Sequence, residues 1–119
     1  MRILVVDDRP INVEVLRDFF EMAGWEVITA ADGEEGINAF RQHDFDFVLT
    51  DLEMPKRDGL DVLAYVAQVR PWIKFALMTG KPDWCIEEIN KGRLNMKDIN
   101  ILYKPLEFSK LFEVINGGT

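Results

Sequence analysis

The sequence predicts an α/β fold, a doubly wound sandwich in which a five-stranded parallel sheet carries helices on both faces. Five short apolar runs alternate along the chain with segments whose apolar residues recur at helical spacing. In addition, polar residues stand where most of those runs stop. Because parallel strands need crossover connections, and these are right-handed in nearly all folds, regular alternation predicts a parallel sheet covered on both sides.

The predicted strands are short runs rich in β-branched and aromatic residues. The first run stops at Asp7 and Asp8, and the third stops at Asp51. The fourth is followed by Thr79 and the fifth by Lys104. In chain order, the predicted strands cover residues 1–6, 25–30, 45–50, 73–78 and 99–103.

The predicted helices follow the strands in turn. Pro10 suits the start of the first helix and Gly24 its end. Glu34 lies favourably near the amino end of the second helix, and Pro71 ends the third. The fourth lacks a continuous apolar stripe. In chain order, the predicted helices cover residues 10–23, 34–42, 60–70, 84–90 and 108–115.

The composition excludes several classes of function. At 119 residues the chain has room for one domain, which we expect to cover residues 1–119. No apolar stretch approaches the ~20 residues of a membrane-spanning helix, so we expect no membrane insertion and a cytoplasmic location. A net charge of -7 argues against direct nucleic-acid binding. A lone Cys85 and a lone His43 argue against disulfides, thiolate or imidazole metal centres, and a Ser/His/Asp triad.

If the predicted strands form one parallel sheet, the polar residues at their ends meet at its carboxyl edge, where open α/β sheets bind ligands. These residues are Asp7, Asp8, Asp51, Thr79 and Lys104. Each alone has a structural interpretation, since an Asp pair after a strand is typical of a helix cap and first turn. Their joint placement at four strand ends favours a functional site.

Three carboxylates brought close together repel one another, and a raised pKa or a bound cation relieves the repulsion. Oxygen ligands alone favour Mg²⁺, which needs one or two carboxylates, several waters and a substrate phosphate. Thr79 can donate a hydrogen bond to a phosphoryl oxygen, and Lys104 supplies a compact positive charge. The set therefore predicts Mg²⁺-dependent phosphoryl chemistry.

Four motifs, in order along the chain, carry a resemblance to a known family. They are Val5-Val6-Asp7-Asp8, then Leu49-Thr50-Asp51-Leu52-Glu53-Met54-Pro55 with Asp58-Gly59 following, then Leu77-Met78-Thr79-Gly80, and finally Lys104-Pro105. With these motifs the chain resembles the receiver domain of two-component response regulators over essentially its whole length. The resemblance implies a flavodoxin-like sheet with strand order 2-1-3-4-5, and a single-domain response regulator.

The resemblance also implies the chemistry of the acidic residues. Asp51 would be the phosphoacceptor, attacking the phosphorus of a phosphohistidine on a sensor histidine kinase or a histidine phosphotransfer protein. Asp8 would bind Mg²⁺ directly and Asp7 mainly through water. The backbone carbonyl of Glu53 would complete the protein's share of the coordination.

By the same resemblance, the hydroxyl of Thr79 would move to the phosphoryl group, and Lys104 would pair with Asp51 or its phosphate. The peptide bond between Lys104 and Pro105 would be cis. The chain would assist its own phosphorylation and dephosphorylation without being an enzyme for a separate substrate. Its output would be a changed affinity for a separate downstream protein.

The chain departs from the family at Ile101, where receivers often carry a Phe or Tyr that turns inward on activation. We therefore expect activation to be read out by the loop after Thr79 and by the fourth helix, and a phosphorylation-independent receiver is an alternative. An aspartyl-phosphate phosphohydrolase is less favoured, because it would need a second Asp where this chain has Glu53. Glu53 and Lys81 occupy positions that tune phosphoryl lifetime, in a direction that the sequence does not give.

Overall fold

The computed structural model describes residues 1–54, 58–80 and 100–116. Five strands in these ranges form one parallel sheet with the order β2-β1-β3-β4-β5. They are β1 (Arg2–Val6), β2 (Glu26–Ala30), β3 (Phe47–Asp51), β4 (Lys74–Thr79) and β5 (Asn100–Tyr103). The predicted fold class and strand order are therefore confirmed.

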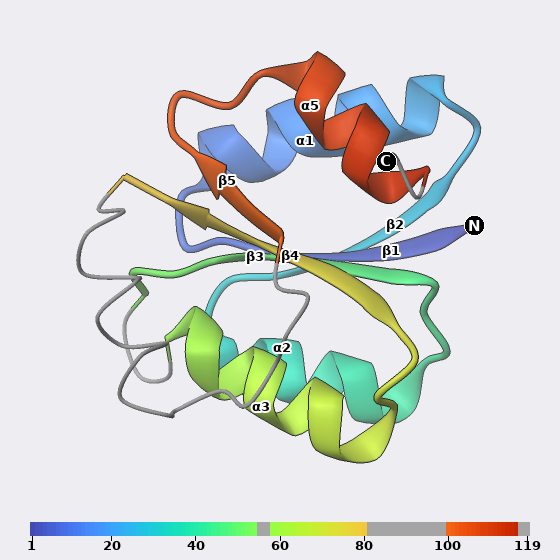
Figure 1. Cartoon of the computed structure of the whole chain (residues 1–119), viewed down its shortest axis with the longest axis vertical. Helices are drawn as coiled ribbons and strands as arrows, with labels where there is room; N and C mark the ends of the chain where they lie inside the picture. The colour runs from blue at the N-terminus through green and yellow to red at the C-terminus, as the bar shows by residue number, and fades with distance from the viewer. Residues whose placement is uncertain (55–57, 81–99, 117–119) are drawn as a thin grey trace.

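Helices cover both faces of the sheet (Figure 1). On one face lie α1 (Pro10–Met22) and α5 (Phe108–Ile115), and on the other lie α2 (Gly33–Gln42) and α3 (Gly59–Val69). The helix predicted at residues 84–90 lies outside the described residues. Within the described ranges, no helix has the length and apolar character needed to cross a membrane.

Two apolar layers hold the helices against the sheet. Alternate side chains of a strand point to opposite faces, so Ile3 and Val5 pack with residues of α1 and α5. Leu4 and Val6 pack with residues of α2 and α3. Every residue of β3 is buried. The strands that end at the predicted site are thus fixed from both sides.

Local sequence signals set several helix ends. Pro10 is the first residue of α1, as predicted. The side chain of Asp58 caps α3 by accepting hydrogen bonds from the backbone N–H groups of Leu60 and Asp61, at 3.0 and 3.1 Å. Gly24, after α1, has a φ of +84°, a conformation that residues with a side chain rarely adopt. These signals help to explain why the predicted boundaries of α1, α2, α3 and α5 agree closely with the observed ones.

Candidate functional site

The predicted site residues lie at the carboxyl edge of the sheet. Asp7 and Asp8 directly follow β1, Thr79 ends β4, and Lys104 directly follows β5. The sequence predicted Asp51 just beyond its strand, but it is the last residue of β3, because its backbone still pairs with β4. The structure therefore brings all five to one edge, while their chemical roles remain predictions.

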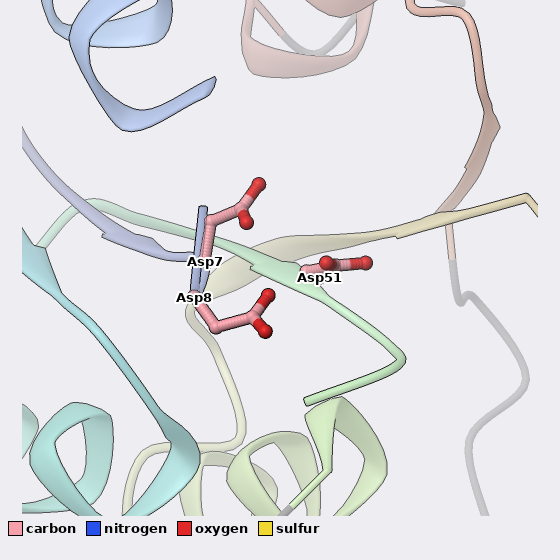
Figure 2. Close-up of side chains that lie close together, drawn as sticks. All are labelled: Asp7, Asp8 and Asp51. Carbon is pink, nitrogen blue, oxygen red and sulfur yellow. The ribbon is translucent and has the colours of Figure 1, made fainter. Parts of the chain in front are cut away.

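Three carboxylates converge at this edge. Asp7, Asp8 and Asp51 each offer one carboxylate oxygen, and these oxygens lie within 4.8 Å of one another. Figure 2 shows Asp7 and Asp8 at the end of β1, with their carboxylates extending to the side of the strand end where Asp51 lies. Asp7 and Asp51 are each only 1% exposed, whereas Asp8 is more open to solvent. The three carboxylates are therefore close enough together to hold one metal ion between them, directly or through a water molecule.

The two carboxylate oxygens of Asp7 have different environments. Oδ1 accepts a hydrogen bond from the backbone N–H of Arg9 at 2.9 Å. Oδ2 is buried and has no hydrogen-bond partner among the residues that the structure describes. A buried oxygen without a partner is costly unless something binds it. Together with the oxygen-only ligand set, this atom fits a bound Mg²⁺.

Asp51 pairs with Lys104. The Nζ of Lys104 lies 2.9 Å from Oδ1 of Asp51. The pKa of the Asp51 carboxyl is nevertheless raised, from its ordinary value of 3.8 to about 6, chiefly by burial. Lys104 opposes this rise through its hydrogen bond and its charge, and the charges of Asp7 and Glu53 add to it. The ion pair thus offsets only part of the cost of burying an anion here.

Thr79 is fully buried, and its hydroxyl has an acceptor in the loop after β3. Its Oγ1 donates a hydrogen bond to Oε1 of Glu53 at 2.8 Å. The Glu53 side chain therefore contacts Thr79 rather than joining the carboxylate cluster. This contact was not predicted from the sequence, which gave Glu53 a metal-binding backbone carbonyl and a position that tunes phosphoryl lifetime, but no hydrogen bond with Thr79. The available signal was that both residues sit at neighbouring strand ends.

Backbone contacts hold the strand ends in register. The N–H of Lys104 donates to the carbonyl of Thr79 at 2.9 Å, and the peptide bond between Lys104 and Pro105 is cis, as expected. Gly59 begins α3 directly against the end of β3. A Cβ at this position would overlap the backbone oxygen of Asp51 and crowd the Leu77 side chain. The helix can approach Asp51 this closely only because Gly59 has no side chain.

Among the residues that the structure describes, open clefts border the acidic edge on the side of α1. One, of about 320 Å³, is lined by Asp7, Met78, Lys104 and Phe108 among others. Another, of about 370 Å³, is lined by Asp7, Asp8 and residues of α1 and β2. The acidic edge is therefore accessible from the side of α1.

Ile101 stands where the resemblance noted above leads one to expect an aromatic residue. It is half-buried on β5 and packs against the apolar layer under α2 and α3. Tyr103, two residues later, is 52% exposed. The fourth helix, expected to take part in the readout, and Lys81 lie outside the described residues.

Comparison with known proteins identifies relatives of this chain. TcrX, a probable transcriptional regulatory protein of Mycobacterium tuberculosis, is 37% identical over 79 residues, which are 66% of this chain and 34% of TcrX. The chain thus spans about a third of that protein's length. The chemotaxis protein CheY of Thermotoga maritima is 30% identical over 118 residues, covering 97% of this chain and 94% of CheY.

Structural comparison agrees with the sequence matches. The response regulator protein TrrA from Thermotoga maritima, solved in complex with Mg(2+)-BeF, superposes with a TM-score of 0.83 at 29% identity. The match covers 98% of this chain and 96% of TrrA. The sequence model of the response regulator receiver domain matches residues 3–116. The chain therefore belongs to the response regulator receiver family, as a CheY-like receiver domain of two-component signalling.

Proposed function

We propose that Asp51 accepts a phosphoryl group from a phosphohistidine in a Mg²⁺-dependent reaction, and that phosphorylation changes the affinity of this domain for a separate downstream protein. The main support for this proposal is the environment of the Asp51 carboxylate. It is 1% exposed, it lies beside two further carboxylates, and it contacts an ammonium group at 2.9 Å. Such a group is a positioned nucleophile with charge compensation already in place.

Asp51 supplies the nucleophile of the transfer. With a pKa of about 6 it is mostly ionised at pH 7, yet more basic than an ordinary carboxylate. One of its oxygens attacks the phosphorus, the P–N bond of the phosphohistidine breaks, and the electron pair of that bond stays on the imidazole nitrogen, while the proton on the other ring nitrogen keeps the leaving imidazole neutral. The product is an acyl phosphate on Asp51 and a free histidine on the donor.

Mg²⁺ would be held by Asp8, Asp7 and Asp51, with the backbone carbonyl of Glu53 as a further ligand. The unpartnered buried oxygen of Asp7 supports this set, as does the 4.8 Å span of the carboxylate oxygens. When bound, the ion supplies positive charge that offsets the repulsion between carboxylates and phosphoryl oxygens.

Lys104 and Thr79 act on the phosphoryl group after transfer. Lys104 already contacts the acceptor carboxylate, so its ammonium group is placed to pair with the phosphoryl oxygens once the carboxylate is phosphorylated. The hydroxyl of Thr79, at the end of the neighbouring strand, donates to a phosphoryl oxygen in the phosphorylated state. Both interactions stabilise the acyl phosphate that the transfer produces.

The phosphoryl donor in this proposal is a sensor histidine kinase or a histidine phosphotransfer protein, and the site of action is the cytoplasm. Residues 1–119 act as one receiver domain that passes its signal to another protein and turns over no separate substrate. The open clefts beside Asp7 give a donor histidine access to the acidic edge.

The test is intact-mass analysis after incubation with Mg²⁺ and either phosphoramidate or acetyl phosphate. Wild type is expected to gain one phosphoryl group, and Asp51→Asn none. Asp18→Asn, an exposed aspartate of α1, is the matched control and should be phosphorylated like wild type.

Two results would contradict the proposal. If the wild type gains no phosphoryl group although Mg²⁺ binding is demonstrated, the chain is a phosphorylation-independent receiver. If it releases phosphate from small phosphomonoesters over many turnovers, it is an aspartyl-phosphate phosphohydrolase.

A further inference from the structure

The hydroxyl of Thr79 is already engaged before any phosphoryl group is present. It donates to Oε1 of Glu53 at 2.8 Å, and Thr79 itself is fully buried. A hydroxyl carries one proton and makes one strong donor bond at a time. While this proton points to Glu53, it is withheld from a phosphoryl oxygen on Asp51.

We propose that the Glu53 side chain is a positioning residue that holds the Thr79 hydroxyl in the unphosphorylated state and must release it when Asp51 is phosphorylated. This inference rests on the proposed function of Asp51, but it assigns the side chain of Glu53 a role separate from that of its backbone carbonyl. The two anions, the Glu53 carboxylate and the phosphoryl group, compete for a single hydrogen-bond donor.

The chemistry of the contact explains why it resists activation. Hydrogen bonds to a carboxylate are stronger than those between neutral groups, and the 2.8 Å between Oγ1 of Thr79 and Oε1 of Glu53 is an ordinary distance for a hydroxyl donor. Glu53 follows Asp51 by two residues, so its charge lies near the acceptor, and it contributes to the raised pKa of Asp51. A phosphoryl group arriving on Asp51 therefore meets both an occupied hydroxyl and a nearby like charge.

The same geometry explains how the contact ends. Glu53 is half-buried and sits in the loop between β3 and α3, so its side chain has solvent available once it leaves Thr79. Repulsion from the phosphoryl oxygens favours this outward position. Phosphorylation would thus replace the Glu53 carboxylate by a phosphoryl oxygen as the acceptor of the Thr79 hydroxyl, and would displace the Glu53 side chain in the same event.

The experiment measures the affinity of the protein for beryllium fluoride, a phosphoryl mimic, at saturating Mg²⁺ by calorimetry. Four proteins form a double-mutant cycle: wild type, Glu53→Ala, Thr79→Ala and the double variant. Glu53→Ala is expected to bind about tenfold more tightly than wild type, because the unliganded state loses a charge-assisted hydrogen bond. In the Thr79→Ala background the same substitution should give a clearly smaller gain, because no hydroxyl remains to be released.

Glu53→Gln adds a matched control, since it keeps an acceptor oxygen without the charge. It is expected to bind with an affinity between wild type and Glu53→Ala. Thermal unfolding of each variant without ligand shows that the fold is intact, and Thr79→Val, which has the shape of threonine but no hydroxyl, replaces Thr79→Ala if that variant is unfolded. In the background of Thr79→Ser, which keeps the hydroxyl, the full gain from Glu53→Ala should return.

Distinct results overturn the different parts of the argument. If Glu53→Ala raises the affinity for beryllium fluoride equally in the wild-type and Thr79→Ala backgrounds, Glu53 acts only through its charge. If it raises the affinity in neither background, the Glu53 side chain does not restrain the Thr79 hydroxyl. In the Thr79→Ser background, absence of a gain would likewise rule out the hydroxyl contact. Failure of the wild type to bind beryllium fluoride at all would instead remove the proposed function of Asp51.

Discussion

Replacing Asp51 by Asn is expected to make the unphosphorylated protein more stable at neutral pH, although it removes an ion pair. The Asp51 side chain is almost fully buried, and its pKa is raised in the folded state from 3.8 to about 6. Ionisation of this carboxyl at pH 7 therefore opposes folding even with Lys104 at 2.9 Å. Asn has nearly the same shape as Asp and carries no charge.

The size of the effect follows from the pKa change. A rise from 3.8 to about 6 corresponds to about 3 kcal/mol at 1.36 kcal/mol per unit. The burial cost of the Asn amide and the loss of the charge-assisted contact with Lys104 reduce the gain, so we expect about 1 to 3 kcal/mol at pH 7. Because the folded-state pKa is raised, the wild type has the full stability of the protonated carboxyl below pH 3.8 and loses it as pH rises through about 6. The advantage of Asp51→Asn should thus shrink to below about 1 kcal/mol at pH 4.

Urea unfolding between pH 4 and pH 8, in the presence of EDTA, measures this difference. Asp18→Asn, on the exposed side of α1, serves as the control, and its effect should stay within about 0.5 kcal/mol. The reasoning is refuted if Asp51→Asn is less stable than wild type at pH 7, or if its advantage is as large at pH 4 as at pH 7. Either result would mean that the buried carboxylate is fully compensated by its surroundings.

Three other changes test the site. Lys104→Met should lower stability by about 2 kcal/mol at pH 7 and by less at pH 5, since it leaves Asp51 buried without its cation; denaturant titrations at the two pH values measure this. Mg²⁺ at ten times its dissociation constant should raise the free energy of unfolding by about 1.4 kcal/mol, and Asp7→Asn should shift this response to higher Mg²⁺ in thermal melts. Gly59→Ala should cost about 1 to 3 kcal/mol because its Cβ overlaps the backbone of Asp51, whereas Gly80→Ala, whose Cβ would have no atom of the described residues within 4 Å, should cost far less in the same urea titration.

Much of the fold was predictable because it is encoded over short stretches of chain. Strand and helix periodicities depend on residues at most a few positions apart, as in β1, whose alternate side chains pack on opposite faces. Alternating strands and helices permit few topologies, and the parallel orientation of the strands follows from this alternation, whereas their order was implied by the family resemblance. Residues at successive strand ends then meet at one edge, which is why Asp7, Thr79 and Lys104 could be placed together before the structure was known.

Only the tertiary structure decided how these side chains interact. Glu53 and Thr79 are 26 residues apart, and their hydrogen bond depends on the path of the loop after β3 and on the register of β3 with β4. The raised pKa of Asp51 likewise depends on burial by several elements at once, which no local pattern records. The sequence by itself determined which chemical groups share an edge, because residue periodicity is local and because few topologies connect alternating strands and helices. The structure decided which group contacts which, because differences of about an ångström in loop and side-chain position select a hydrogen-bond partner.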